Sequence, residues 1–139
     1  MKGLKTAKTK AWKNFSIFIR TRDCIENNDS LESGLCYTCE KPYDIKRLQC
    51  GHFLPGRNNK VLFDEEQTHS QCYHCNIGLS GNWPEYLKKM VRELGQDKVD
   101  QMLNTHKEVV KYTQEDYEQI AKKYKDKYEQ LVREYKLNH

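Results

Sequence analysis

The sequence predicts an α+β protein in which a small ββα unit, clamped by a metal ion, lies between an N-terminal helix and a helical C-terminal part. Two Cys-x-x-Cys pairs enclose the middle of the chain, and such pairs are typical of closed zinc sites. Apolar residues recur at helical spacing near both ends of the chain. The middle instead carries short apolar runs separated by turn residues, which favours strands.

The length of 139 residues is that of about one domain. We expect three parts within it: a basic N-terminal arm and helix (1–30), the metal-stapled core (34–82) and the helical C-terminal part (83–139). Hydrophobic residues make up 37 % of the chain and charged residues 32 %, which is more polar than a typical globular domain. The core must therefore be small, and small cores often depend on a metal ion or a partner subunit.

The N-terminal arm is strongly basic. Its first 22 residues contain no acidic side chain and seven basic ones: Lys2, Lys5, Lys8, Lys10, Lys13, Arg20 and Arg22. Such an arm either contacts phosphates or forms a solvated, partly disordered tail. The apolar residues in its second half are three and four positions apart, and they predict a docked helix over 9–25: Trp12, Phe15, Phe18 and Ile19.

The core begins with a turn between two cysteines, followed by a predicted strand over 45–54. The segment "PGRNN" breaks this strand, and "KVLF" (60–63) predicts the second one. A helix that begins at or just after Cys72 would close the ββα unit.

The C-terminal part begins where a glycine and a proline interrupt the chain. Asn82 is expected to cap a helix with Pro84 in its first turn, and Gly95 is expected to end that helix after Leu94. A short helix over 97–105 follows.

The last helix is the most regular part of the sequence. Thr113 and Asp116 resemble a capping box at its start. Residues that advance by four and three then form a heptad seam: Tyr117, Ala121, Tyr124, Tyr128, Leu131 and Tyr135. A tyrosine-rich seam suits a free-standing coiled coil poorly, because each hydroxyl needs water or a partner. Packing against the N-terminal helix of the same chain is favoured over a dimeric coil.

Targeting signals and membrane spans are not expected from the sequence. No stretch approaches the ~18 apolar residues of a membrane span, and the basic N-terminus lacks the pattern of a signal peptide. A cytoplasmic protein without membrane contact is therefore expected. Thiols stay reduced in that compartment, so the six cysteines favour metal binding over disulfides.

The two cysteine pairs are Cys36 with Cys39 and Cys72 with Cys75, separated by 32 residues. Each tight bend presents two thiolates, and four thiolates complete a tetrahedral Zn²⁺ shell. A closed shell stabilises structure and performs no chemistry; the alternative is four unbound, buried cysteines. The two other cysteines, Cys24 and Cys50, are expected to be small buried hydrophobes, and His74 to lie at the surface.

The residues between and after the cysteine pairs resemble the layout of HNH nucleases. The resemblance rests on eight residues: Cys36, Cys39, His52, Pro55, Gly56, Cys72, Cys75 and Asn76. It implies a zinc-clamped ββα-metal finger in which His52 is the general base and Asn76 helps bind one divalent cation. Imidazole titrates near neutral pH, and an amide oxygen suits Mg²⁺ or Mn²⁺. The alternatives are a packing histidine and a helix-capping asparagine.

A closer likeness extends over most of the chain. The segments "GHF", "FDEEQTHSQCYHCNIGLSGN", "LGQDKVDQMLNTH" and "YTQEDYEQIAKKY" resemble the lambdoid phage recombination proteins called NinG or Rap. This resemblance implies a structure-specific endonuclease that acts on branched recombination intermediates, including Holliday junctions, in the cytoplasm of the host cell.

Two positions depart from the HNH pattern. Gly51 occupies the position where HNH enzymes commonly have a metal-binding Asp or His. The replacement ligand would come from one of four side chains: His52, Asp64, His69 or Asn82. Gln67 stands in place of the central Asn, where a longer amide can still brace the loop.

The predicted function is metal-dependent hydrolysis of phosphodiester bonds in branched DNA such as four-way junctions. His52 would activate water, and Asn76, helped by His69 or Asn82, would hold Mg²⁺ or Mn²⁺. The basic arm, with Arg57 and Lys60, would contact phosphates without reading sequence.

Resolving a four-way junction takes two matched nicks, and a two-fold homodimer would supply both. Three rival functions remain open. They are a non-catalytic zinc-finger DNA-binding protein, a sequence-reading HNH nuclease, and a zinc finger that binds other proteins.

Overall fold

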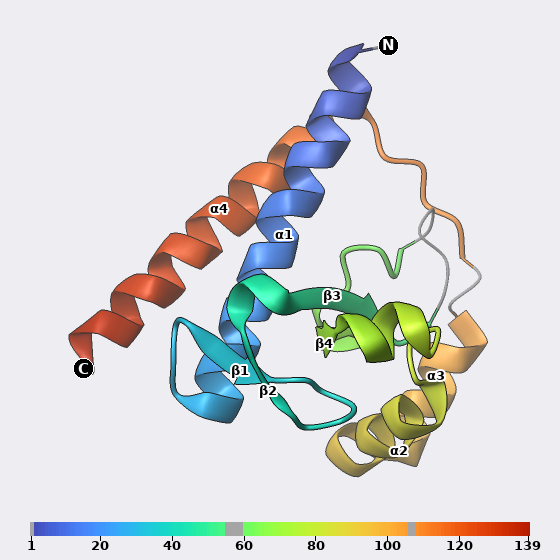
Figure 1. Ribbon diagram of the computed structural model, residues 1–139. Coiled ribbons are helices and arrows are strands. Elements are labelled where there is room, and N and C mark those ends of the chain that lie inside the picture. Colours follow the sequence, from blue (N-terminus) through green and yellow to red (C-terminus); the bar gives the residue numbers. More distant parts are fainter. Residues whose placement is uncertain (1, 55–59, 106–107) are drawn as a thin grey trace.

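The computed structural model describes residues 2–54, 60–105 and 108–139 (Figure 1). They form a mixed α+β fold with two small antiparallel sheets. The helices and strands, in chain order, are α1 (Lys2–Asn28), β1 (Ser33–Leu35), β2 (Pro42–Asp44), β3 (Leu48–His52), β4 (Thr68–Cys72), α2 (Trp83–Leu94), α3 (Gln96–Thr105) and α4 (Gln114–Leu137).

Helices α1 and α4 lie side by side and run in the same direction (Figure 1). Small residues allow close approach near their first turns: Ala7, Ala11, Tyr117 and Ala121 share one buried cluster. Further along, the ring of Phe15 meets that of Tyr124 edge-on, with 4.8 Å between centroids. Because α4 covers the start of α1, the helix begins at Lys2 rather than at residue 9 as predicted, and the basic arm is helical.

The heptad seam of α4 packs within the same chain, which confirms the favoured interpretation. Tyr124 contacts the α1 cluster, and the Tyr135 hydroxyl donates to Asp29 O over 2.8 Å at the far end. The predicted capping box is present, since Thr113 and Asp116 bond each other's backbone N–H. The homodimer stays a prediction.

Strands β3 and β4 pair in antiparallel register, with Gly51 opposite His69 and His52 opposite Thr68. One face of this hairpin packs against α1, where Cys50 joins Phe15 in a buried cluster. The opposite face carries His69, whose ring stacks on Tyr37. Paired residues share a face of the hairpin, and neighbouring residues of a strand point to opposite faces. His69 is paired with Gly51, the neighbour of His52, so the two histidines lie on different faces.

Of the two predicted strands of the core, the first was too long, since β3 covers Leu48–His52, and the second was wrong. The run 45–54 breaks into pieces because the Asp44 side chain accepts a hydrogen bond from Lys46 N and caps a 3-10 turn, Ile45–Arg47. The "KVLF" segment is a turn in which Val61 and Leu62 are buried. The real partner of β3 is β4, whose sequence "THSQC" shows no apolar alternation.

The small β1–β2 ribbon presents the first cysteine pair. It is held close to α1 at Gly34, where an added Cβ would lie 2.9 Å from the Cα of Cys24. Both spare cysteines, Cys24 and Cys50, are buried and unlinked, as predicted.

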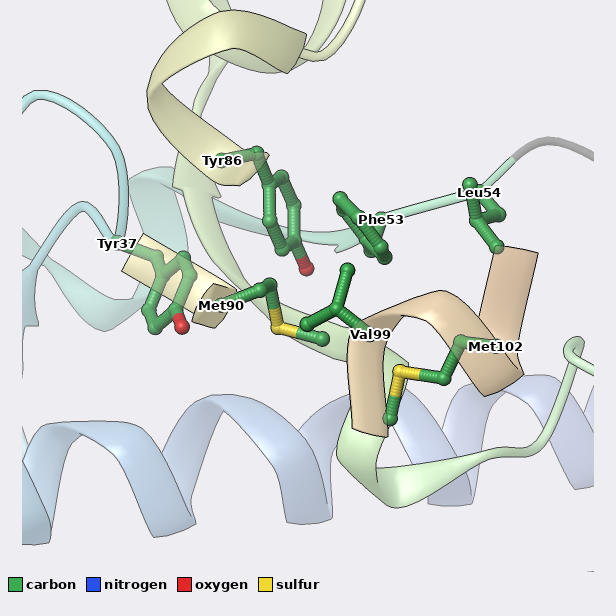
Figure 2. Packing of buried hydrophobic residues seen from close by; sticks show 7 residues of the cluster. All are labelled: Tyr37, Phe53, Leu54, Tyr86, Met90, Val99 and Met102. Atoms are coloured by element: carbon green, nitrogen blue, oxygen red, sulfur yellow. The ribbon is translucent and has the colours of Figure 1, made fainter. Parts of the chain in front are cut away.

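A second core lies beneath α2 and α3, on the side of the hairpin away from α4. Figure 2 shows its seven buried side chains converging from four segments: Tyr37, Phe53, Leu54, Tyr86, Met90, Val99 and Met102. The predicted helix at Cys72 is a five-residue π-helical turn, His74–Gly78. Gly95, with φ at 90°, ends α2 as predicted. Within the described ranges no helix has the length and apolarity needed to cross a membrane.

Candidate metal centre and basic groove

The four cysteines predicted as metal ligands lie together. Cys36 and Cys39 come from the turn between β1 and β2, Cys72 ends β4, and Cys75 lies in the π-helical turn. Their sulfur atoms all lie within 4.8 Å of one another, and those of Cys39 and Cys72 are 3.9 Å apart. Tetrahedral Zn²⁺ with ordinary Zn–S bonds places sulfurs about 3.8 Å apart. The set can therefore hold a metal ion such as zinc.

Hydrogen bonds favour the ionised, metal-binding form of the Cys36 thiol. Burial opposes ionisation of Cys36, but hydrogen bonds from the Cys39 backbone and the Thr38 hydroxyl outweigh it and lower the pKa of Cys36. Cys72 Sγ accepts from the backbone N–H of Cys75 at 3.4 Å. These contacts would orient the sulfurs around a cation.

Asn82 occupies the N-cap position of α2, as predicted, but its side chain contributes to the same cluster. Its backbone is left-handed, with φ 50° and ψ 52°, and its side chain makes no capping hydrogen bond. The amide Nδ2 instead donates to Cys75 Sγ over 3.6 Å. This role places Asn82 beside the thiolates.

His52 ends β3 and faces α1. Its ring stacks on Trp12 with 5.3 Å between centroids, and its Nε2 lies 3.1 Å from Leu62 O. Because a carbonyl oxygen can only accept, Nε2 is the donor in this contact. His52 also lines a cavity of about 400 Å³ together with Lys5 and Lys8 of α1.

A second cavity, of about 380 Å³, also has Trp12 in its lining. Asn76 and Arg20 line it, together with Leu48 and Gln49 of β3. The Asn76 amide Nδ2 donates to Gln49 Oε1 over 2.8 Å, so this side chain does not act as a helix cap. Trp12 is thus a shared wall, and we call the two cavities together the basic groove.

His69 lies outside the basic groove. Its ring stacks on Tyr37 at 3.8 Å, and Nδ1 contacts the Tyr86 hydroxyl at 3.1 Å. Burial, together with the charges of Arg22 and Lys89, lowers the pKa of His69 to about 3. The structure therefore places a neutral His69 in a packed environment and does not bring it together with His52.

The remaining candidate residues are engaged elsewhere or fall outside the described residues. Asp64 caps a 3-10 turn by accepting from Glu66 N, and it also accepts from the Gln67 side chain at 3.0 Å. Lys60 pairs with Glu108 at 2.8 Å at the surface, and its contact with phosphates stays a prediction. Pro55, Gly56 and Arg57 lie outside the described residues.

Two residues of this region were not anticipated. Trp12 was expected only to dock its helix, yet it lines both cavities of the basic groove. Gln71 was not considered, although its side chain is fully buried beside Gly51 and Asn76. Trp12 stands out as an aromatic residue among lysines, whereas no local pattern distinguishes Gln71.

Comparisons with known proteins, by family profile and by curated relatives, point to the same family. The family profile described as "Bacteriophage Lambda NinG protein" matches residues 1–134. Curated relatives named "Protein ninG", from Enterobacteria phage H19B, Escherichia phage 933W and Enterobacteria phage VT2-Sa, are each 36 % identical over 47 residues. That stretch covers 34 % of this chain and 23 % of each relative. No solved structure matches the chain.

Proposed function

The chain belongs to the NinG family of phage proteins, and from this premise we propose that it is a metal-dependent endonuclease of the HNH type. Its substrate would be branched DNA, such as a Holliday junction, in which it hydrolyses phosphodiester bonds. The four-cysteine cluster would hold Zn²⁺ as a structural ion, because four thiolates leave no coordination position for chemistry.

The observation that carries the proposal is the position of His52 in the basic groove. A titratable imidazole lines the same cavity as Lys5 and Lys8, which suits an anionic substrate. Its Nε2 lies 3.1 Å from Leu62 O, which orients the ring in the groove. General bases in enzymes are often oriented by such a contact.

The hydrolysis needs proton transfer and one displacement. The His52 imidazole would accept a proton from water, the water oxygen would form a bond to phosphorus, and the bond to the leaving oxygen would break, with that oxygen taking up a proton from solvent. A divalent cation such as Mg²⁺ or Mn²⁺ would neutralise the charge that develops on the phosphate oxygens. Asn76, which lines the second cavity of the basic groove, is the side chain that would hold this cation.

The basic face of α1 would bind the DNA backbone. Lys5 and Lys8 are exposed at the rim of the basic groove, so they can approach phosphates with little loss of side-chain burial. Binding through phosphates depends steeply on salt and little on sequence. A homodimer would place two such grooves on one junction and allow paired nicks.

One observation favours a second candidate, a non-catalytic DNA-binding protein. Gly51 has no side chain at the position where HNH enzymes carry a metal ligand. Without a replacement ligand, the groove would bind phosphates but would not hydrolyse them.

The test is a nicking assay with a labelled four-way junction, a matched linear duplex and Mg²⁺. The wild-type protein is expected to nick the junction preferentially, and His52→Ala is expected to lose at least about 100-fold in rate, the usual contribution of a general base. His74→Ala is a matched control, since His74 is exposed on the π-helical turn outside the groove. Junction affinity is measured in parallel by fluorescence anisotropy.

Tight, salt-sensitive binding without nicks by the wild-type protein would favour the non-catalytic candidate. Equal nicking by His52→Ala and the wild-type protein would remove His52 from the mechanism. Cleavage of the linear duplex at one defined site would indicate a sequence-reading nuclease instead.

A further inference from the structure

Gly51 is a glycine because a neighbouring side chain occupies the space of its missing side chain. Its backbone has no positive φ, so conformation does not demand glycine here. An added Cβ would overlap Gln71 Oε1 and would lie 2.8 Å from Gln71 Cδ. Asn76 Oδ1 lies 3.1 Å from the same point. Two amide oxygens therefore converge where a Gly51 side chain would stand.

The orientation of the Gln71 amide is fixed by its other partners. Its Nε2 donates to Gly81 O over 2.8 Å and to Thr38 Oγ1 over 3.1 Å. A carbonyl oxygen cannot donate, so flipping the amide would place two acceptors against each other. Oε1 is consequently forced toward Gly51 and Asn76.

The buried position of the Gln71 amide oxygen destabilises the folded protein. The residue is fully buried, and Oε1 accepts no hydrogen bond from any described residue. A buried, unsatisfied acceptor destabilises a protein, because its hydrogen bonds to water are lost without replacement. Such a cost is explained when the atom has a partner in the working state of the protein.

We propose that Gln71 and Asn76 together bind the catalytic cation, with Gln71 supplying from β4 the oxygen ligand that Gly51 cannot supply from β3. This inference rests on the proposed endonuclease function and names the missing ligand of that site. Hard divalent cations such as Mg²⁺ and Mn²⁺ prefer oxygen ligands, including amide oxygens. The DNA phosphate and water would complete the coordination shell.

The other candidates for this ligand are less suitable. His69 is stacked on Tyr37 on the side of the second core, and Asn82 directs its amide nitrogen at Cys75 Sγ. Asp64 already accepts two hydrogen bonds at its own turn. The Gln71 oxygen, by contrast, lies next to the same point beside Gly51 as Asn76 Oδ1.

The proposal is tested by direct Mn²⁺ binding, measured through the electron paramagnetic resonance signal of free Mn²⁺ in zinc-loaded protein. Mn²⁺ is a poor match for the thiolates, so the signal reports the oxygen site. Gln71→Leu keeps most of the volume and removes the oxygen, and is expected to weaken Mn²⁺ binding by about tenfold or more. Gln67→Leu is the matched control, because the Gln67 amide oxygen is also buried without a partner among the described residues.

A double variant keeps the test decisive if Gln71→Leu folds poorly. Gly51→Asp alone would clash with Gln71 and is expected to bind Mn²⁺ weakly, whereas Gly51→Asp with Gln71→Ala has room for a carboxylate ligand from β3. The double variant is expected to regain Mn²⁺ affinity at least equal to that of the wild-type protein. Zinc content and thermal melting of each variant report its folding.

The outcomes separate this inference from the proposed function. Wild-type levels of Mn²⁺ binding and junction nicking in a folded Gln71→Leu variant, or no recovery in a folded double variant, would overturn the role of Gln71 while leaving the endonuclease proposal standing. A wild-type protein that neither binds Mn²⁺ nor nicks the junction would overturn both.

Discussion

The α1–α4 helix pair and the metal knuckle are held together by different forces. We define the knuckle as the two cysteine turns, residues 36–39 and 72–78. The helix pair buries aromatic rings such as Phe15 and Tyr124 against each other. The knuckle buries Cys36, Cys72 and Cys75, with Cys39 and Tyr43 packed alongside, and its Tyr37 reaches into the second core. Apolar burial therefore stabilises the helix pair, whereas the cysteine cluster would be stabilised by sulfur–metal bonds.

This difference separates the stability of the scaffold from that of the candidate site. Lys5, Lys8 and Trp12 belong to the helix pair, while Asn76 belongs to the knuckle. The basic groove is therefore complete only when a metal-dependent region is docked on a metal-independent one. Three predictions test this division, from the largest expected effect to the smallest.

Metal removal is expected to have the largest effect, confined to the knuckle. Structural zinc binding contributes on the order of 10 kcal/mol in small metal-dependent folds, so chelation or Cys72→Ser should disorder residues 72–82. The helix pair should keep its α-helical content, because its buried contacts involve no cysteine of the knuckle. Far-ultraviolet circular dichroism and hydrogen exchange of the metal-free protein measure the two regions separately.

A Cys24→Ser variant is the matched control, since Cys24 is equally buried but outside the cluster. It is expected to retain the metal and the exchange protection of the knuckle. Cooperative loss of all helix on metal removal would show that the two regions do not fold independently.

Phe15→Ala is expected to have the next largest effect, and on the opposite region. Phe15 is 0 % exposed and contacts the rings of Tyr124 and Phe63. Removing such a side chain costs about 3–5 kcal/mol of unfolding free energy, measured by urea denaturation. Zinc stoichiometry should stay unchanged at temperatures where the variant is folded.

Phe15→Leu retains most of the buried volume and should cost clearly less, because the cavity it leaves is smaller. Loss of zinc from folded Phe15→Ala would contradict the division between the two regions.

The fold was predictable wherever local chemistry determines it. Helices α2, α3 and α4 follow from apolar periodicity, Gly95 and the Thr113 capping box. Strand β4 was missed because its buried polar groups find partners far along the chain: Ser70 N donates to Asp23 of α1 over 2.7 Å. Partners at such separations leave no periodic pattern in the sequence.

The candidate site was likewise predictable where it depends on local spacing, and not where it depends on long-range packing. The spacing of the cysteines was enough to group all four, since each pair comes from one tight turn. The resemblance to HNH nucleases indicated His52, but its neighbours Lys5 and Trp12 depend on how α1 packs. The convergence of Gln71 and Asn76 likewise arises from the register of β3 and β4, which the sequence did not indicate.

The third prediction concerns the pH dependence of stability caused by His69, and its expected effect is the smallest of the three. Burial lowers its folded-state pKa to about 3, whereas the unfolded value is near the usual ~6.5. Below pH ~6.5 the unfolded chain binds a proton that the folded protein does not, so stability falls as the pH falls toward 3. Between pH 7 and pH 5 the expected loss from this residue is about 2 kcal/mol.

His69→Phe isolates this contribution, because a phenyl ring can still stack on Tyr37 but cannot titrate. Thiolate protonation at the knuckle affects both proteins and cancels when urea unfolding at pH 7 and pH 5 is compared between them. The wild-type protein should lose about 2 kcal/mol more than the variant. Equal losses would mean that His69 titrates normally in contact with solvent, and its imidazole would again compete with Gln71 as the missing ligand beside Gly51.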